Sequence, residues 1–397
     1  MQMDKNDFMW SDNWWIEGTT AWFVDGQQNM LFQLDLESKS CKLLAAIPSS
    51  NLDRFRINPK CIKYEECIYC MPTYGDCIWV YNIVNSEFNK INIVNKEQVP
   101  LGINNFWLFE KNIYVVSTGL KKVVRIDLVS RKTEYYDITV NKNEVISLST
   151  KVGEKIYIVS GKSNVVYVFD MLSFNVSMKV VSNINSKLRT ICYDGDKFWL
   201  SGYCNEIYIW RENDNKATIL TNLPRNLKKY NFSNGNKEIL EYSTKYDMPL
   251  FIDSIQIGDN VWFIPFHMND IIYINKNTYE IKVFELENEE ETRDSILKKG
   301  RLCAKYLVEG IYNNRYLILF SLKNNYIFEI DTESKIAIKE SYNMQECSLN
   351  DIKNFTNGSF YEYNLIDRLL YTQQIRCNKG KMQDHKLTGK FIVKKTI

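Results

Sequence analysis

One pattern of fourteen residues recurs seven times along this chain of 397 residues, and it constrains the fold more than any other feature. The copy at 22–35 reads WFVDGQQNMLFQLD. Each copy opens on an apolar, mostly aromatic residue, at Trp22, Tyr69, Tyr114, Tyr157, Phe198, Trp262 and Ile318. Three positions later stands a small or turn-forming residue, at Asp25, Pro72, Ser117, Ser160, Ser201, Pro265 and Ser321.

A polar loop and a second apolar run complete each copy. The loop carries Asn or Asp in six of the seven copies, at Asn29, Asp76, Asn164, Asn205, Asn269 and Asn325. The apolar run closes on Asp35, Asn82, Asp127, Asp170, Asn275 and Asp331, with Arg211 as the exception. Because Asp and Asn side chains bond to backbone amides two residues on, we expect this closing column to hold turns.

The spacing of the repeat identifies the architecture. The first four closing residues are 47, 45 and 43 positions apart, which is the length of a four-stranded blade. The apolar runs are rich in β-branched and aromatic residues, which favour strands. The sequence therefore predicts an all-β fold, a seven-bladed β-propeller of four-stranded blades. The blades are predicted at 13–47, 60–94, 105–138, 145–181, 188–220, 254–284 and 304–340.

Weaker patterns supply the two remaining strands of each blade. Inner strands are predicted at 145–149, 188–192 and 254–257. Outer strands are predicted at 42–47, 87–93, 132–136, 280–284 and 335–340. The outer segments alternate apolar with charged residues, as expected of a strand with one solvated face.

Two insertions and a tail depart from the repeat. The insertions at 221–253 and 285–303 are polar, and we interpret both as surface excursions on a rigid scaffold, where binding function is often found. The second has an acidic start and a basic end that would also suit a short helix.

The tail at 341–397 contains two candidate elements. Leu365, Ile366, Leu369 and Leu370 have helical spacing, which predicts an amphipathic helix over 360–373. A strand candidate follows at 389–393. A terminal strand that completes the first or last blade would remove an open sheet edge, and we expect either 13–17 or 389–393 to do so.

Composition excludes several classes of function. The net charge is +2, and no basic tract or aromatic-plus-basic motif indicates nucleic acid. No apolar run reaches the length of a membrane span, and the N-terminus does not resemble a secretory signal. Many of the ten cysteines fall inside predicted strands, so we interpret them as reduced core residues and expect a cytoplasmic protein. The oligomeric state is left open.

Sequence motifs for catalysis and cofactor binding are missing. The chain has no GxSxG, Walker A, GxGxxG, HExxH or EF-hand motif, and no cofactor is expected. Two histidines are too few for a histidine-rich metal site. The spacing Cys67 to Cys70 lies along one strand, where the two side chains face opposite sides.

The loops between second and third strands are expected to open beside the central channel. Five positions after each opening residue lies the least uniform column of the repeat, which includes Gly119. We predict that the other residues of this loop column form a polar and aromatic binding surface: Gln27, Tyr74, Lys162, Tyr203, His267 and Lys323.

His267 is the single catalytic candidate. It follows a predicted strand within PFHMN and would suit a general base or a ligand at the channel mouth. A loop histidine bonded to backbone is the more common situation, and no partner pattern accompanies it. His385 lies in a polar tail segment and is assigned no role.

Some copies resemble known propeller repeats. Trp262–Pro265 with Ile271–Asn275, and Trp22–Asp25 with the run to Asp35, resemble repeats of streptogramin (virginiamycin B) lyases. The segment 156–170 is similar to the YVTN-type repeat, and Kelch repeats match more loosely because their double glycine is missing.

The lyase resemblance implies a site in which a histidine acts with nearby acidic residues and a magnesium ion, and His267 is the position that would correspond. The isoleucine–glycine typical of the lyases' third strand is replaced by Leu31–Phe32 and Ile271–Ile272.

Three functions remain open at this point. The first is a non-catalytic binding or scaffold protein that recognises a protein, peptide or glycan through the loop face of the ring. The second is a structural subunit of a larger assembly, with an apolar patch near Leu365 and Leu369. The third is a lyase or hydrolase with His267 as base. We rank them in that order, because shared repeats reflect architecture and do not transfer activity.

Overall fold

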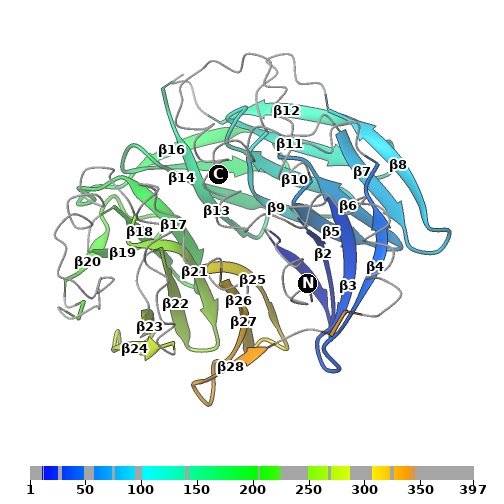
Figure 1. Ribbon diagram of the computed structural model, residues 1–397. Coiled ribbons are helices and arrows are strands. Elements are labelled where there is room, and N and C mark those ends of the chain that lie inside the picture. The colour runs from blue at the N-terminus through cyan, green and yellow to red at the C-terminus, as the bar shows by residue number, and fades with distance from the viewer. Residues whose placement is uncertain are drawn as a thin grey trace, which may run out of the picture.

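A computed structural model shows seven antiparallel four-stranded sheets around a common centre, which is a seven-bladed β-propeller (Figure 1). The described residues are 11, 13–25, 29–48, 58–73, 77–93, 101–138, 143–203, 206–221, 223–224, 249–266, 270–286, 306–321, 326–340 and 343–344. Within these ranges the chain forms strands and turns and no helix, so the predicted fold class is confirmed. The predicted helix at 360–373, the strand at 389–393 and most of both insertions lie outside the described residues.

The strands follow the order of the chain from the centre outward in every blade. The inner strands are β1 (Trp14–Glu17), β5 (Lys60–Tyr64), β9 (Ile103–Phe109), β13 (Ile146–Val152), β17 (Leu188–Tyr193), β21 (Phe251–Ile257) and β25 (Tyr306–Tyr312). The second strands are β2 (Thr20–Asp25), β6 (Cys67–Met71), β10 (Asn112–Ser117), β14 (Lys155–Ser160), β18 (Phe198–Gly202), β22 (Asn260–Pro265) and β26 (Tyr316–Ser321).

The third strands carry the second half of the repeat, and the fourth strands form the outer edge. The third strands are β3 (Met30–Asp35), β7 (Cys77–Asn82), β11 (Lys122–Asp127), β15 (Val165–Asp170), β19 (Ile207–Trp210), β23 (Asp270–Asn275) and β27 (Tyr326–Asp331). The fourth strands are β4 (Ser40–Ala46), β8 (Glu87–Asn92), β12 (Thr133–Asp137), β16 (Val176–Val180), β20 (Thr218–Leu220), β24 (Ile281–Glu285) and β28 (Ile336–Glu340).

The closing column of the repeat holds the turn between third and fourth strands. In blade four, Oδ1 of Asp170 accepts hydrogen bonds from the amides of Leu172 (3.0 Å) and Ser173 (2.8 Å). The same pair of bonds, from the amides two and three residues on, is made at Asp35, Asn82, Asp127, Asn275 and Asp331. The prediction that this column is architectural is therefore confirmed in all six blades that carry Asp or Asn.

A second feature of these turns is a residue with positive φ, which in blades four and seven contacts the preceding blade. The residue four positions after the closing residue has φ between 56° and 60° in all six turns, at Lys39, Ser86, Arg131, Phe174, Tyr279 and Lys335. In blade four, Phe174 stacks on Tyr136 of blade three, with ring centroids 5.1 Å apart. In blade seven, the Nζ of Lys335 lies 4.6 Å from the ring centre of Trp262 in blade six.

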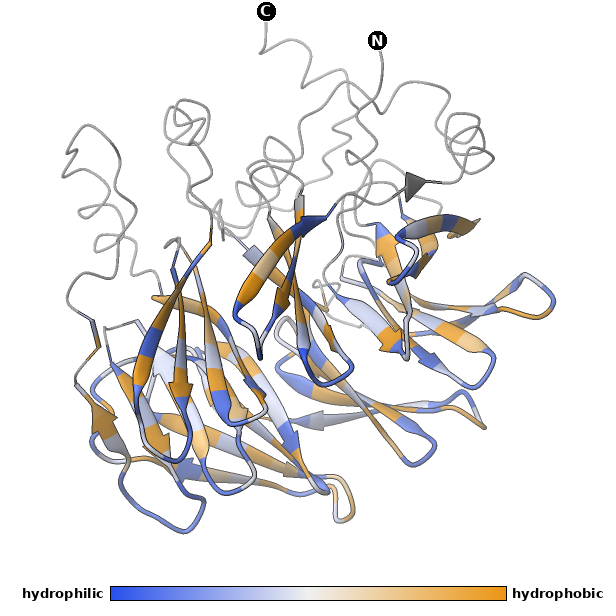
Figure 2. Cartoon of the chain, turned by 90° about the horizontal axis from the view of Figure 1, so that it is seen from below, coloured by the Kyte–Doolittle hydropathy of each residue, from blue (hydrophilic) through white to orange (hydrophobic). Residues whose placement is uncertain are grey.

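The hydrophobic core consists of layers between neighbouring blades. Tyr157 of blade four meets Phe198 of blade five at 4.4 Å between ring centroids, and both rings are buried. Figure 2 shows the apolar residues concentrated in the strands and many hydrophilic residues in the connecting turns. Because a blade's apolar face is covered only by its neighbour, removal of this surface from water favours closure of the ring.

Blades seven and one meet where the ring closes. Glu329 of β27 accepts hydrogen bonds from Lys39 of blade one (2.5 Å) and from the hydroxyl of Tyr312 (2.5 Å). A short strand, β29 (Asn343–Met344), pairs in parallel with β4 at the outer edge of blade one. Within the predicted segment 13–17, β1 is the inner strand of its own blade and packs beside β25.

The described cysteines behave as core residues. All six are free thiols, and Cys41, Cys61, Cys70, Cys77 and Cys192 are buried. Burial raises the pKa of the Cys61 thiol to about 12. These thiols therefore stay protonated and contribute to packing.

Candidate functional site

The loops between second and third strands leave one end of the blades, opposite to the turns between third and fourth strands. Of the six residues predicted to form a binding surface there, the structure describes two, Lys162 and Tyr203. The other four predicted residues lie outside the described ranges: Gln27, Tyr74, His267 and Lys323. The structure thus describes the surroundings of two members of the loop column, and the binding role of all six stays a prediction.

Lys162 projects from a turn whose backbone is fixed. The Oγ of Ser160 accepts hydrogen bonds from the amides of Lys162 and Ser163, both at 3.0 Å. The Ser160 hydroxyl in turn donates to the buried carboxylate of Glu144 at 2.6 Å. The Lys162 side chain is exposed, so it is a solvated cation on a rigid support.

Tyr203 is held more closely against the protein. Its amide donates to the Oγ of Ser186 at 3.0 Å, which fixes the end of β18 against the segment before β17. Its ring lies 5.7 Å from the Nζ of Lys187, a cation–π contact. Tyr203 therefore presents an aromatic face that already accepts a cation on one side.

The inner strand beside Tyr203 carries a β-bulge at Arg189. Leu188 pairs with Gly202 and Thr190 pairs with Ser201, so Arg189 has no partner in the ladder. The inner strands β13, β21 and β25 also shift register. A bulge re-aims the side chain of the extra residue, and here it places a charged residue among the inner strands.

Arg189 makes few hydrogen bonds with the described residues. Its Nη1 donates to the Oγ of Ser147 on β13 at 3.3 Å, and that hydroxyl donates back to the Arg189 carbonyl at 3.1 Å. Its Nε is shielded from solvent and has no hydrogen-bond partner among the described residues. The guanidinium has five N–H donors, so the described residues satisfy a small part of it.

Asp253 of β21 lies near Arg189 without pairing with it. One of its oxygens accepts a hydrogen bond from the amide of Ser254 at 2.8 Å. Burial raises the pKa of Asp253 to about 6, although Arg189 and Lys60 act against the rise. Burial also lowers the pKa of Arg189, with Tyr203 and Asp253 opposing the decrease.

These groups come from separate blades and share one electrostatic environment. Lys60, Arg189 and Asp253 lie on the inner strands of blades two, five and six, which surround the centre of the ring in Figure 1. All three are partly exposed, so solvent reaches them. Two cations therefore face one carboxylate. We call Arg189, Asp253, Lys60 and Ser147 the central cluster.

A second bulged residue shows the opposite outcome. Glu309 is the extra residue in β25, and it is buried. It accepts a hydrogen bond from the hydroxyl of Ser11 at 2.7 Å. Glu309 therefore helps to seat the N-terminal segment where the ring closes.

The central cluster was missed from the sequence. Arg189 stands inside the predicted strand 188–192, LRTIC, and Asp253 directly precedes the predicted strand 254–257. A charged residue in an otherwise apolar inner strand is the signal that would have found it.

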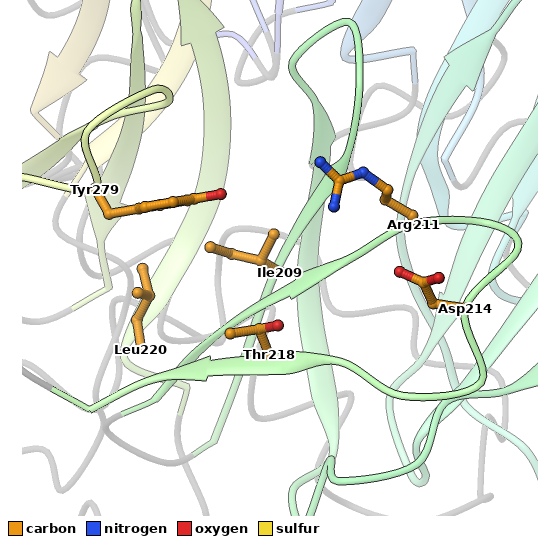
Figure 3. A pocket seen from close by; sticks show the side chains of 6 residues that line it. All are labelled: Ile209, Arg211, Asp214, Thr218, Leu220 and Tyr279. Atoms are coloured by element: carbon orange, nitrogen blue, oxygen red, sulfur yellow. The ribbon is translucent and has the colours of Figure 1, made fainter.

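A shallow pocket of about 170 Å³ lies at the opposite end of blades five and six. Figure 3 shows Tyr279 and Arg211 on opposite sides of it, above Ile209 and Thr218. Arg211 is the exception in the closing column, and its Nη2 bonds to Asp196 at 2.6 Å.

The polar groups around this pocket already have partners. The Tyr279 hydroxyl accepts a hydrogen bond from Lys197 at 3.2 Å. Asp196 raises the pKa of Arg211, so this cation is stabilised by the protein itself. The pocket offers less unused bonding capacity than the central cluster.

Metal ligands and membrane spans were sought among the described residues. No group of three His, Cys, Asp or Glu side chains there could hold a metal ion. Both histidines, His267 and His385, lie outside the described ranges. None of the described segments is a helix long and apolar enough to cross a bilayer.

Comparisons with known proteins relate this chain to others through its fold. No protein-family profile matches the sequence, and no curated protein matches it. Among solved structures it is similar to a catalytically inactive histidine-to-alanine form of virginiamycin B lyase from Staphylococcus aureus with quinupristin. The TM-score is 0.59 at 10% sequence identity, covering 82% of this chain and 96% of the other. The predicted resemblance in architecture is confirmed, and at this identity it concerns the fold alone.

Proposed function

We propose that this protein is a non-catalytic binding propeller that recognises a protein, peptide or glycan through the loop face of the ring. The observation that carries this proposal is the arrangement around Tyr203. Its backbone amide is fixed by the hydrogen bond to Ser186, and its ring is flanked by Lys187 and lies within electrostatic range of Arg189. Aromatic rings and arginines on a rigid support are the groups that dominate binding energy at interfaces.

The support beneath this face favours recognition of a partner of fixed shape. Lys162 and Tyr203 follow the second strands of neighbouring blades, β14 and β18. Hydrogen bonds to Ser160 and Ser186 fix their backbone amides. A ligand that binds here need not order the loops' first residues, so less entropy is lost on association.

A lyase or hydrolase with His267 as general base is the second candidate. The solved structure with a similar fold is that of a lyase, and its inactive form lacks one histidine. In this chain His267 belongs to the loop between β22 and β23, in the loop column. A third candidate is a structural subunit that assembles through the tail around Leu365 and Leu369.

The first test is partner capture with the intact chain as bait. We expect Tyr203→Ala with Lys162→Ala to reduce capture of a specific partner at least about tenfold, as loss of a central contact does. Tyr279→Ala and Lys179→Ala are matched controls, since Tyr279 and Lys179 are exposed at other parts of blades six and four.

The outcomes separate the three functions. Loss of the partner in the double variant alone supports recognition by the loop face. Capture that survives in the double variant contradicts it. Turnover of quinupristin that is lost in His267→Ala would replace the proposal with the lyase. Self-association abolished by Leu365→Asp and Leu369→Asp would replace it with the assembly role.

A further inference from the structure

We infer that the central cluster binds a carboxylate group, with Arg189 as its principal donor. The inference rests on the proposed binding function and names the chemistry of the group recognised. The site is the centre of the ring, where Arg189 of β17 meets Ser147 of β13 and the surroundings of Asp253 on β21.

The unused donors of Arg189 define the ligand's chemistry. A guanidinium presents N–H pairs in a planar fork that matches the two oxygens of a carboxylate. Nη1 makes one long bond to Ser147, and Nε makes none among the described residues while being shielded from solvent. A buried donor without a partner is unfavourable, so an incoming oxygen gains more here than at an exposed arginine.

The surrounding charges favour a singly charged anion. The Arg189 guanidinium is positive, and Asp253 on the neighbouring inner strand adds a negative charge when it is ionised. A singly charged carboxylate therefore meets less repulsion from Asp253 than a doubly charged anion does. A doubly charged phosphate would leave excess negative charge beside Asp253, which is unfavourable where water is partly excluded.

A purely structural role for Arg189 is the alternative. The reciprocal bonds with Ser147 connect blades four and five, so Arg189 also contributes to their contact. A hydrogen bond between these two blades needs only one N–H, and a bond between a backbone group and a hydroxyl would connect them equally well. A tie does not require a charged group with most of its donors unused.

The test is a calorimetric titration of the full chain with benzoate at pH 7, beside its neutral analogue benzamide. We expect saturable benzoate binding of about millimolar affinity, as befits a small ligand, and no benzamide binding. Arg189→Met keeps the apolar stem and removes the charge, and it should weaken benzoate binding at least tenfold. Arg211→Met is the matched control, since that arginine lies in the shallow pocket and is paired with Asp196.

A second variant keeps the test valid if Arg189→Met does not fold. Asp253→Asn removes the negative charge beside Arg189, and it should tighten benzoate binding about threefold to tenfold at pH 7. The charged and titratable groups that act on or near Asp253 are Arg189, Lys60 and Cys192. Of these, burial raises the pKa of Cys192, so this thiol stays neutral.

The same arrangement predicts a pH dependence. Below pH 6 Asp253 takes up a proton in the folded protein, so the wild-type chain should bind benzoate more tightly at pH 5.5 than at pH 7.5. The Asp253→Asn variant should show no such difference. Inorganic phosphate, which is mostly doubly charged at pH 7.5, should bind more weakly than benzoate at that pH.

Three results would overturn the inference. They are absence of saturable benzoate binding, equal binding by a folded Arg189→Met variant, and binding of benzamide as tight as that of benzoate. The proposed function fails separately, when the Tyr203 and Lys162 double variant retains its partner. If the chain binds benzoate but the double variant still captures its partner, the carboxylate site stands and the proposed binding surface on the loop face fails.

Discussion

The outer turns and the centre of the ring use charged residues in opposite ways. At the turns, Asp170 and its five counterparts each accept hydrogen bonds from two backbone amides. All six residues therefore have the same structural role. At the centre, the bulged Arg189 makes one long side-chain hydrogen bond to Ser147, and its buried Nε has no partner among the described residues. Repetition in this chain therefore marks residues that hold the blades, and departure from repetition marks the residues available to a ligand.

The ring closure lies between these two extremes. Glu309 and Glu329 are charged and not part of the closing column, yet both are buried and partnered across the junction of blades seven and one. These two departures from the repeat thus have a structural explanation, because each residue bonds across this junction.

The largest effect is expected at the ring closure. Glu329→Ala removes the acceptor of the Tyr312 hydroxyl and the nearer of the two carboxylates that Lys39 contacts, which should cost about 2–3 kcal/mol of unfolding free energy. Urea unfolding would measure it. Glu333→Ala is the control, because Glu333 is exposed. Equal midpoints for the two variants would show that the closure does not depend on Glu329.

The repeated turn should respond next. Asp170→Ala removes the carboxylate oxygen that accepts from both amides of the blade-four turn. The loss should lower the free energy of unfolding by about 1 kcal/mol. Asp170→Asn keeps the accepting oxygen, as Asn82 and Asn275 do in their blades, and should stay close to wild type. A loss as large in Asp170→Asn as in Asp170→Ala would show that charge rather than the acceptor matters.

The stabilising contribution of the closing column should depend on pH. Backbone hydrogen bonds, led by that of Ser173, lower the pKa of Asp170 in the folded state. Its stabilising contribution is therefore present above about pH 4 and lost as the pH falls through the lowered pKa. A urea series from pH 6 to pH 3 should show a smaller decline for Asp170→Asn. Identical declines would contradict this origin.

A smaller effect is expected where blade seven contacts blade six. Lys335 lies over the rings of Trp262 and Tyr273 at 4.6 and 4.5 Å, and burial lowers the pKa of its amine. Lys335→Met keeps the stem and removes the cation, at a cost of about 0.5–1 kcal/mol. The exposed Lys339→Met provides the baseline, and a difference of zero between them would exclude a cation–π contribution.

The smallest effect is expected at the exception in the closing column. Arg211→Asn restores the residue type of the repeat, but the blade-five turn is built differently, with the Trp210 indole donating to the Asp214 carbonyl at 2.8 Å. No measurable stabilisation should follow in urea unfolding. A clear gain would show that the closing residue acts independently of the turn around it.

The fold was predictable because its determinants are local and repeated. The predicted outer strand at 87–93 corresponds to β8, Glu87–Asn92, and the predicted inner strand at 188–192 to β17, Leu188–Tyr193. The closing residues reveal the turns because each acts on amides two and three positions away. Seven repetitions of this signal leave few alternative architectures.

The central cluster was not predictable in the same way. It depends on a bulge that re-aims Arg189, and on the meeting of strands that are far apart in the chain, such as β17 and β21. The alternation of apolar and polar residues along a strand does not reveal where an extra residue forms a bulge. The loop column indicated Tyr203 beside this cluster, but Arg189 itself required the register of β17 against β18.

The most direct test compares urea unfolding of Arg189→Met with that of Asp170→Ala. If Arg189 is kept for a ligand, its replacement by an apolar residue should leave the free energy of unfolding unchanged or raise it by up to about 1 kcal/mol. Asp170→Ala should lower it. A loss in Arg189→Met as large as the loss in Asp170→Ala would contradict the account and assign Arg189 to the architecture of the ring.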